Sequence, residues 1–317
     1  MSVLNFFKRV SFYPKSLILR WKILVARRLL LSNHPQQWYA LDNLGIYGFG
    51  TDLLRIDFLP KKNPQPLWGY ESQPNRALYD LLNADISDQI QLLKSIVELT
   101  KDYTQWSEKE DEENPNLPWR INEFLLPFDA VSLYGIIQYL RPKKYIEIGS
   151  GMSTRVACLA KSKGNIPMEM ISIDPEPRLS IAQLCDQVYR VRLEDFNCDE
   201  FLSLVTPDTL IFFDGSHRVF PSSDVTVFFL TLLPNLPKGC IVHIHDIYLP
   251  NDYPPELQNR LWSEHYLLAA YLLGGSKHLQ VLLPCAHLAS NQIAKELFAE
   301  SFAIKEFPGC SFWLKIV

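Results

Sequence analysis

The sequence predicts an α/β protein with a doubly wound, mostly parallel sheet and helices on both faces. From Trp119 onward, short apolar segments alternate with segments of helical periodicity, which is typical of parallel strands joined by helical crossovers. A glycine turn, with Gly149 and Gly151, follows the first of these strands. Polar residues also cluster at the expected ends of the later strands, and ligands bind at the carboxyl ends of strands in such sheets.

The elements of this region are expected in a regular order along the chain. Strands are expected over 144–149, 169–174, 188–193, 209–214, 240–246, 278–284 and 311–317. Helices are expected over 128–140, 153–162, 177–185, 223–233, 255–273 and 292–299. The helix over 255–273 is predicted as one long element. Right-handed crossovers then bring the strand ends to a single edge of the sheet.

Three segments are expected along the chain of 317 residues. A basic amphipathic leader covers 1–34, and a mostly helical extension covers 35–118, with a helix over 87–103 and an acidic, proline-containing linker over 107–118. The α/β domain covers 119–317. The leader is too short and too charged to span a bilayer, and it lacks the pattern of a secretory signal. It either lies on an anionic membrane surface or packs on the domain as an amphipathic helix.

Composition and charge exclude several classes of protein. The chain is 47% hydrophobic and 21% charged, which is typical of a globular protein. Its six cysteines have no C-x-x-C spacing, so we expect buried thiols in a reducing, cytoplasmic setting and no zinc site built on cysteine pairs. With a net charge of −4 overall and +7 in the leader, the remaining residues carry −11. We therefore expect no nucleic-acid partner.

The glycine turn distinguishes between two kinds of cofactor. A dinucleotide favours the pattern G-x-G-x-x-G, but Thr154 stands in the place of the third glycine, and Glu147 would repel a diphosphate. S-adenosylmethionine has an ammonium and a cationic sulfur, which Glu147 attracts, and free amides of the turn can take its carboxylate. Asp174, at the end of the next strand, suits the two ribose hydroxyls. The turn therefore favours S-adenosylmethionine.

Four ordered motifs carry a resemblance to a known family. They read IEIGSGMST, ISIDPEPR, FFDGSH and VHIHDIYLPNDYP. The region from about Trp119 to Leu283 resembles the class I S-adenosylmethionine-dependent methyltransferases, in a largely uncharacterised bacterial branch. The resemblance implies a seven-stranded Rossmann-like sheet whose last strand, over 311–317, runs antiparallel. It also implies a set of cofactor-binding residues, namely Glu147, Gly149, Ser150, Gly151, Ser153, Thr154, Asp174 and Asp214, with Glu194 and Asp195 on the adenine side.

A cluster of acids and histidines at the fourth and fifth strands carries the predicted chemistry. The D-x-x-H spacing of Asp214 and His217 is similar to that of metal-dependent sugar O-methyltransferases, which implies that His217 is a general base and Asp214 a further catalytic residue. Asp214, His245 and Asp246 are the candidate ligands of a divalent cation, although His245 departs from the acid of that family. We expect His243 to be structural, with one of His243 and His245 facing the helix layer.

The predicted function is methylation of a hydroxyl on a sugar or other small metabolite. An NAD(P)-dependent oxidoreductase of the same fold, a non-catalytic binding module and a metal-assisted hydrolase remain alternatives. The aromatic residues Trp262, Tyr266 and Tyr271 are expected in the core rather than against a substrate.

Overall fold

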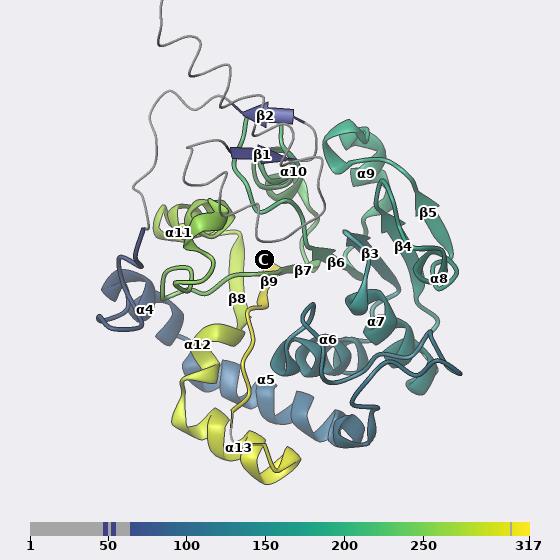
Figure 1. Ribbon diagram of the computed structural model, residues 1–317, viewed down its shortest axis with the longest axis horizontal. Coiled ribbons are helices and arrows are strands. Elements are labelled where there is room, and N and C mark those ends of the chain that lie inside the picture. Colours follow the sequence, from purple (N-terminus) through teal and green to yellow (C-terminus); the bar gives the residue numbers. More distant parts are fainter. Residues whose placement is uncertain (1–46, 50–51, 55–63, 305) are drawn as a thin grey trace, which may run out of the picture. The chain divides into compact units, whose positions relative to one another are not determined.

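The computed structural model describes residues 47–49, 52–54, 64–304 and 306–317 (Figure 1). The leader over 1–34 lies outside the described residues, so its membrane contact stays a prediction. The chain divides into two compact units, Met1–Pro64 and Gln65–Val317. In the first unit, β1 (Tyr47–Phe49) pairs antiparallel with β2 (Asp52–Leu54). All further statements concern the second unit.

The second unit is built on one seven-stranded sheet. Its strands are β3 (Lys144–Ile148), β4 (Glu169–Ile173), β5 (Gln187–Tyr189), β6 (Thr209–Phe213), β7 (Ile241–Ile244), β8 (Leu279–Pro284) and β9 (Phe312–Ile316). They lie in the order β5-β4-β3-β6-β7-β9-β8. Within this sheet β9 pairs antiparallel with both of its neighbours, whereas β3 to β7 pair in parallel. The doubly wound, mostly parallel sheet and its antiparallel last strand are confirmed.

The change in strand order places a crevice at the centre of the sheet. From β3 the chain continues to β4 and β5 on one side, and then returns to β6 on the other side of β3. The carboxyl ends of β3 and β6 therefore stand together with helices leaving them in opposite directions. Ligands bind at this topological switch point in open α/β sheets.

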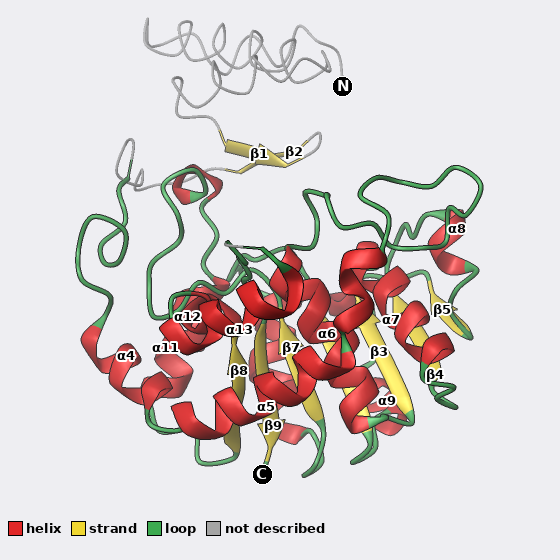
Figure 2. Cartoon of the chain, turned by 90° about the horizontal axis from the view of Figure 1, so that it is seen from below, coloured by secondary structure: helices red, strands yellow, loops and turns green. Residues whose placement is uncertain are grey.

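Helices cover both faces of the sheet (Figure 2). They are α4 (Arg76–Asn83), α5 (Ile86–Leu99), α6 (Pro127–Leu140), α7 (Met152–Lys163), α8 (Leu179–Ala182), α9 (Cys198–Leu204), α10 (Asp224–Val227), α11 (Glu264–Leu273), α12 (Cys285–Ala289) and α13 (Gln292–Phe302). One core packs α5, α6, α7 and α13 against the sheet. The core on the other face contains residues of α4, α9, α10 and α11.

Local sequence explains where several helices begin and which face they bury. Pro127 opens α6, where the missing N–H of proline has no cost. The side chain of Asn291 accepts hydrogen bonds from Ile293 N and Ala294 N and thereby caps α13. On β3, Ile146 and Ile148 contribute to one core and Tyr145 to the other, because successive side chains of a strand point to opposite faces.

The extension before the sheet belongs in part to the compact unit. Helix α5 packs on α6 so closely that a Cβ at Gly135 would lie 2.3 Å from Ile96 Cγ2. The acidic segment 107–118 has no helix or strand, as expected of a linker, but Arg120 N donates to Ser107 O at 2.8 Å. Among the described residues, we find no helix with the length and hydropathy needed to span a bilayer.

The prediction of one long helix over 255–273 is wrong. Instead, a short 3₁₀ helix, η6 (Gln258–Arg260), is followed by Leu261 at φ 55°, and α11 begins only at Glu264. The reason is a contact distant in sequence: the amides of Ser263 and Glu264 donate to His217 O at 2.8 and 3.2 Å. This contact turns the chain toward the loop after β6 before the helix starts.

Two other predicted elements are shorter than expected. The helix over 177–185 is reduced to the single turn of α8, and the strand over 188–193 ends at Tyr189. The helix over 223–233 changes character, from α10 to a π-helix, η4 (Phe228–Leu232), and then to a 3₁₀ turn, η5 (Leu233–Asn235). Proline at position 234 prevents a regular helix from continuing there.

Candidate functional site

The glycine turn joins the carboxyl ends of β3 and β6. Gly149 has φ +80°, and a Cβ there would lie 2.1 Å from the carbonyl oxygen of Asp214. Asp214 N in turn donates to Ile148 O at 3.0 Å. Because this backbone approach leaves no room for a side chain, glycine is required at position 149.

Glu147 lies beneath the glycine turn. Its carboxylate accepts hydrogen bonds from Tyr145 Oη at 3.0 Å and from Thr154 Oγ1, and Thr154 Oγ1 accepts from Gly151 N at 3.0 Å. Burial raises the pKa of Glu147 to about 7, although hydrogen bonds from Ser153, Thr154 and Tyr145 oppose this. Neither Glu147 nor Thr154 lines the cavity above the turn. They support the turn from inside, and their direct contact with a cofactor stays a prediction.

Asp174 is fixed beside the turn from the end of β4. Ser150 N donates to Asp174 Oδ2 and Glu176 N to Asp174 Oδ1, each at 2.8 Å. Gly149 N donates to Ile173 O at 3.3 Å. With Gly151 N held by Thr154, the three amides of the turn all have acceptors in the chain. These three amides are therefore not free, and the expectation that amides of the turn take a cofactor carboxylate stays a prediction for Met152 N and Ser153 N, whose residues line the cavity.

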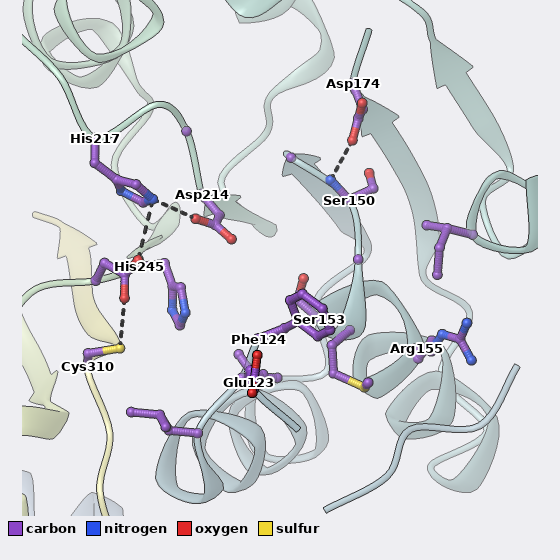
Figure 3. Close-up of a pocket in the computed structure, with 18 of the residues that line it drawn as sticks. Glu123, Phe124, Ser150, Ser153, Arg155, Asp174, Asp214, His217, His245 and Cys310 are labelled. Carbon is purple, nitrogen blue, oxygen red and sulfur yellow. Dashed lines mark hydrogen bonds and ion pairs between the residues drawn. The ribbon is translucent and has the colours of Figure 1, made fainter. Parts of the chain in front are cut away.

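A cavity of about 550 Å³ lies above these strand ends (Figure 3). Its size is in the range of small-molecule sites. Of the predicted cofactor residues, it is lined by Gly149, Ser150, Gly151, Ser153, Asp174 and Asp214. Phe124 and its neighbours in the segment before α6 close one side, where Arg178 Cζ lies 5.8 Å from the ring of Phe124.

The structure does not bring the expected adenine-side acids to this cavity. Glu194 and Asp195 lie on a 3₁₀ turn, η3 (Leu193–Asp195), and neither lines it. Asp195 is exposed to solvent. Arg178 and Ile181, which the sequence did not indicate, line the cavity after β4.

The far end of the cavity holds His217 between carboxylates. His217 Nε2 lies 3.4 Å from Asp214 Oδ1, a contact drawn as a dashed line in Figure 3, and 3.4 Å from Asp246 Oδ2. The atoms that these three residues offer as ligands lie within 4.8 Å of one another. Of the residues predicted for the chemistry, the structure brings Asp214, His217 and Asp246 together from two different strand ends, but not His245.

Glu264, which the sequence did not single out, holds the other side of His217. Its Oε2 lies 2.9 Å from His217 Nδ1, and the carboxylate is fully buried. Burial opposes a charge on His217, but the hydrogen bond and charge of Glu264, with the charges of Asp214 and Asp246, raise the pKa of His217 to about 9. The free site therefore favours the imidazolium at neutral pH. Trp262, expected in the core, lines the cavity with its ring centroid 4.4 Å from that of His217.

His245 falls into a second group of side chains. It lies with Asp129 and Cys310, all three buried, and their ligand atoms are within 4.8 Å of one another. Asp214 and Asp246, predicted with it as metal ligands, group with His217 instead. Asp129 was not among the predicted site residues, because an acid in the first turn of a helix such as α6 is common.

The expectation that His243 and His245 face opposite ways is wrong. Their ring centroids are 5.6 Å apart, and both rings stack against Phe212, at 3.8 and 6.1 Å. Residues two apart on a strand share a face. His243 Nε2 lies 2.7 Å from Ser311 Oγ, and burial lowers the pKa of His243 well below its usual range. His243 is thus a neutral core residue that contacts the segment before β9.

Comparisons with known proteins agree with a methyltransferase. Residues 146–247 match the model of a methyltransferase-domain family. This stretch runs from β3 to just beyond β7 and includes the glycine turn, Asp174, Asp214, His217 and Asp246. No curated protein matches the sequence.

Two solved structures are similar to the chain at low identity. One is the methyltransferase PaMTH1 of Podospora anserina bound to S-adenosylhomocysteine (SAH), with 14% identity, a TM-score of 0.38, and coverage of 74% of this chain and 97% of that one. The other is the plantazolicin methyltransferase BamL with a triazolic substrate analogue and SAH, with 12% identity, a TM-score of 0.38, and coverage of 75% and 99%. At these TM-scores the likeness defines no function. The family match and the sheet order support a methyltransferase enzyme.

Proposed function

We propose that this protein is an S-adenosylmethionine-dependent methyltransferase that methylates a hydroxyl of a sugar or other small metabolite. The observation that supports it most is the position of His217. Its Nε2 faces two carboxylates at the far end of the cavity, and the glycine turn and Asp174 line the same cavity. One cavity therefore offers a cofactor end and a proton-accepting end.

The residues fit S-adenosylmethionine in two respects. Asp174 is anchored by two backbone amides yet lines the cavity, so its carboxylate oxygens keep lone pairs for the ribose hydroxyls. The carboxylates of Asp214 and Asp246 favour the positive charge of the sulfonium and ammonium groups. The amides of Gly149, Ser150 and Gly151 are hydrogen-bonded within the chain, which does not favour a diphosphate at these three positions.

In the proposed reaction, the hydroxyl oxygen attacks the methyl carbon in line with the sulfonium. The bond from sulfur to carbon breaks as the bond from oxygen to carbon forms, and SAH leaves as a neutral thioether. His217 Nε2 takes the hydroxyl proton, while Glu264 keeps Nδ1 protonated and the ring oriented. Positioning supplies the larger part of the acceleration, and a histidine base typically adds about 10²–10⁴-fold.

The raised pKa of His217 sets a condition on this role. A base must be neutral, whereas the free site favours the imidazolium with a pKa of about 9. The cationic sulfonium brought in by the cofactor disfavours a second positive charge nearby. We therefore expect cofactor binding to lower the pKa of His217 and to prepare it for proton transfer.

A divalent cation is an alternative to the histidine base, because His217 Nε2 cannot bind an ion and accept a proton at the same time. Asp214 and Asp246, with His217 Nε2 at 3.4 Å from each, are the groups that would hold it. When bound there, such an ion would lower the pKa of an acceptor hydroxyl.

The proposal is tested by release of SAH from S-adenosylmethionine with panels of sugar, phenol and carboxylate acceptors. We expect turnover with a hydroxyl acceptor, and a loss of about 10²–10⁴-fold in His217→Asn. Asparagine tolerates the positive φ of this position, 59°. His278→Asn is the control, because His278 lies away from the cavity with Nε2 3.2 Å from Tyr271 Oη. Tight binding of NADH, with none of S-adenosylmethionine, would contradict the proposal.

A further inference from the structure

A buried cluster of three potential ligands lies beside the proposed transfer site. Asp129 is in the first turn of α6, His245 follows β7, and Cys310 precedes β9. All three are at most 4% exposed. Elements that are far apart in the sequence thus bring a carboxylate, an imidazole and a thiol together, and the proposed methyl transfer uses none of the three.

The thiol of Cys310 contacts two carboxylates at once. Its Sγ lies 3.4 Å from Asp129 Oδ2 and 3.3 Å from Asp246 Oδ1. A thiol has one proton and is a weak donor. It can satisfy one of these contacts, and the other then sets a sulfur lone pair against a carboxylate oxygen. The arrangement lacks a positive centre among these three atoms.

The surrounding charges show the same deficit. Four carboxylates meet in this region, those of Asp129, Asp214, Asp246 and Glu264. The imidazoles that face them belong to His217 and His245. Burial raises the pKa of Asp129 and Asp214, and raises that of Glu264 to about 7, so the chain alone disfavours full ionisation of these carboxyl groups, whereas a bound cation would favour it. Buried negative charge without compensation is strongly unfavourable.

His245 has a ring nitrogen without a partner. Its Nδ1 is fully buried and has no hydrogen-bond partner among the described residues. A buried polar group without a hydrogen-bond partner is unfavourable, and a bound ion is one of its recognised explanations. The residue itself is 4% exposed.

We propose that Asp129, His245 and Cys310 bind a thiophilic divalent ion such as Zn²⁺, with the fourth position left to Asp246 Oδ1 or a water molecule. The three residues offer ligand atoms within 4.8 Å of one another. Bond lengths of about 2.3 Å to sulfur and 2.0 Å to oxygen place the two atoms about 3.5 Å apart in a tetrahedral site. The observed separations of 3.4 and 3.3 Å agree with that value.

The nature of the donors selects the ion. A thiolate and an imidazole favour zinc and its neighbours over magnesium and calcium. Asp129 is also oriented by the backbone, since it accepts hydrogen bonds from Cys310 N at 2.8 Å and Ser311 N at 2.7 Å. Hydrogen bonds of this kind orient ligating carboxylates in known metal sites.

The proposed ion has a different place and donor set from a cation at Asp214, His217 and Asp246, and it does not depend on methyl transfer. It would join α6, the end of β7 and the start of β9 at one point. Asp246 links the two sites, because its Oδ1 faces Cys310 and its Oδ2 faces His217. A zinc site on paired cysteines was not expected from the sequence, and this site uses one cysteine only.

Cobalt spectroscopy on the full chain tests the proposal without any measurement of activity. After chelator treatment, the protein is titrated with Co²⁺, which reports a bound thiolate by charge-transfer absorption. We expect this absorption to saturate at about one equivalent and to be displaced by Zn²⁺. Cys310→Ala should lose it. The control Cys240→Ala should keep it, because Cys240 is equally buried but precedes β7 at the opposite edge of the sheet.

Two more variants separate this site from its neighbour and guard against misfolding. Asp214→Asn should keep the charge-transfer absorption, since Asp214 belongs to the other group of ligands. His245→Gln should weaken Co²⁺ binding by about tenfold or more while the circular dichroism spectrum stays that of the wild type. Absence of charge-transfer absorption in the wild type, or its persistence in Cys310→Ala, would overturn the proposal. Unchanged cobalt affinity in His245→Gln would do the same.

Discussion

Substitution of Gly149 by alanine tests the geometry on which the cofactor end of the site depends. Gly149 has φ +80°, and an added Cβ would lie 2.1 Å from Asp214 O. A left-handed conformation costs a non-glycine residue about 1–2 kcal/mol, and overpacking adds about 1–3 kcal/mol. The carbonyl of Asp214 cannot retreat easily, because Asp214 N is bonded to Ile148 O.

We therefore expect Gly149→Ala to lower the free energy of unfolding by about 2–5 kcal/mol. The chain offers a matched control two residues away. Gly151 has φ −171°, and a Cβ there would meet nothing within 4 Å. Gly151→Ala should change the free energy of unfolding by less than about 1 kcal/mol.

Urea unfolding measures both variants, with ΔG taken from linear extrapolation. Calorimetry with S-adenosylmethionine should also show weaker binding for Gly149→Ala, because the clash moves Ser150, whose amide anchors Asp174. Equal stability of the two variants would refute the reasoning. It would mean that the ends of β3 and β6 separate at little cost.

Three further predictions concern the cofactor, the base and the leader. Asp174→Ala should weaken S-adenosylmethionine binding by roughly 1.5–3 kcal/mol, and unchanged affinity of a folded variant in calorimetry would remove Asp174 from the site. The turnover rate at saturating substrate should rise with pH between the ordinary histidine pKa of 6.5 and about 9, because neutral His217 is the active form. Glu264→Gln should move that rise to lower pH, since the charge of Glu264 raises the pKa of His217. A pH profile that does not move would argue against the proposed pairing of His217 with Glu264. If residues 1–34 bind membrane, the full chain should sediment with anionic liposomes, and less so at high salt; sedimentation that is independent of salt and of lipid charge would exclude this mechanism.

The sheet could be predicted because its strands are short, apolar and separated by helices. The strands β3, β4, β6 and β7 are buried almost throughout, so their apolar runs in the sequence were clear, whereas the edge strand β5 is only partly buried and its extent was not predicted. The glycine turn and Asp174 could also be placed, since their distance from a strand end is fixed by the local sequence.

Features that depend on distant contacts could not be predicted in the same way. The start of α11 depends on amides that bind His217 O, and the segment 255–273 alone has the periodicity of one helix. In the sequence Glu264 falls in the middle of the helix expected over 255–273, and Asp129 is an acid in the first turn of α6. Only the fold shows that Glu264 faces His217 and that Asp129 faces the segment before β9.

At position 217 the backbone and the side chain have different roles: the backbone anchors α11, and the side chain belongs to the proposed reaction site. The carbonyl of His217 accepts the two amides that set the start of the helix, and this contact is independent of the side chain. The imidazole alone meets Glu264, Asp214 and Asp246. Protein engineers therefore have a position at which the reactive group can be exchanged for another side chain that accepts φ 59°, with the helix that frames the cavity kept in place.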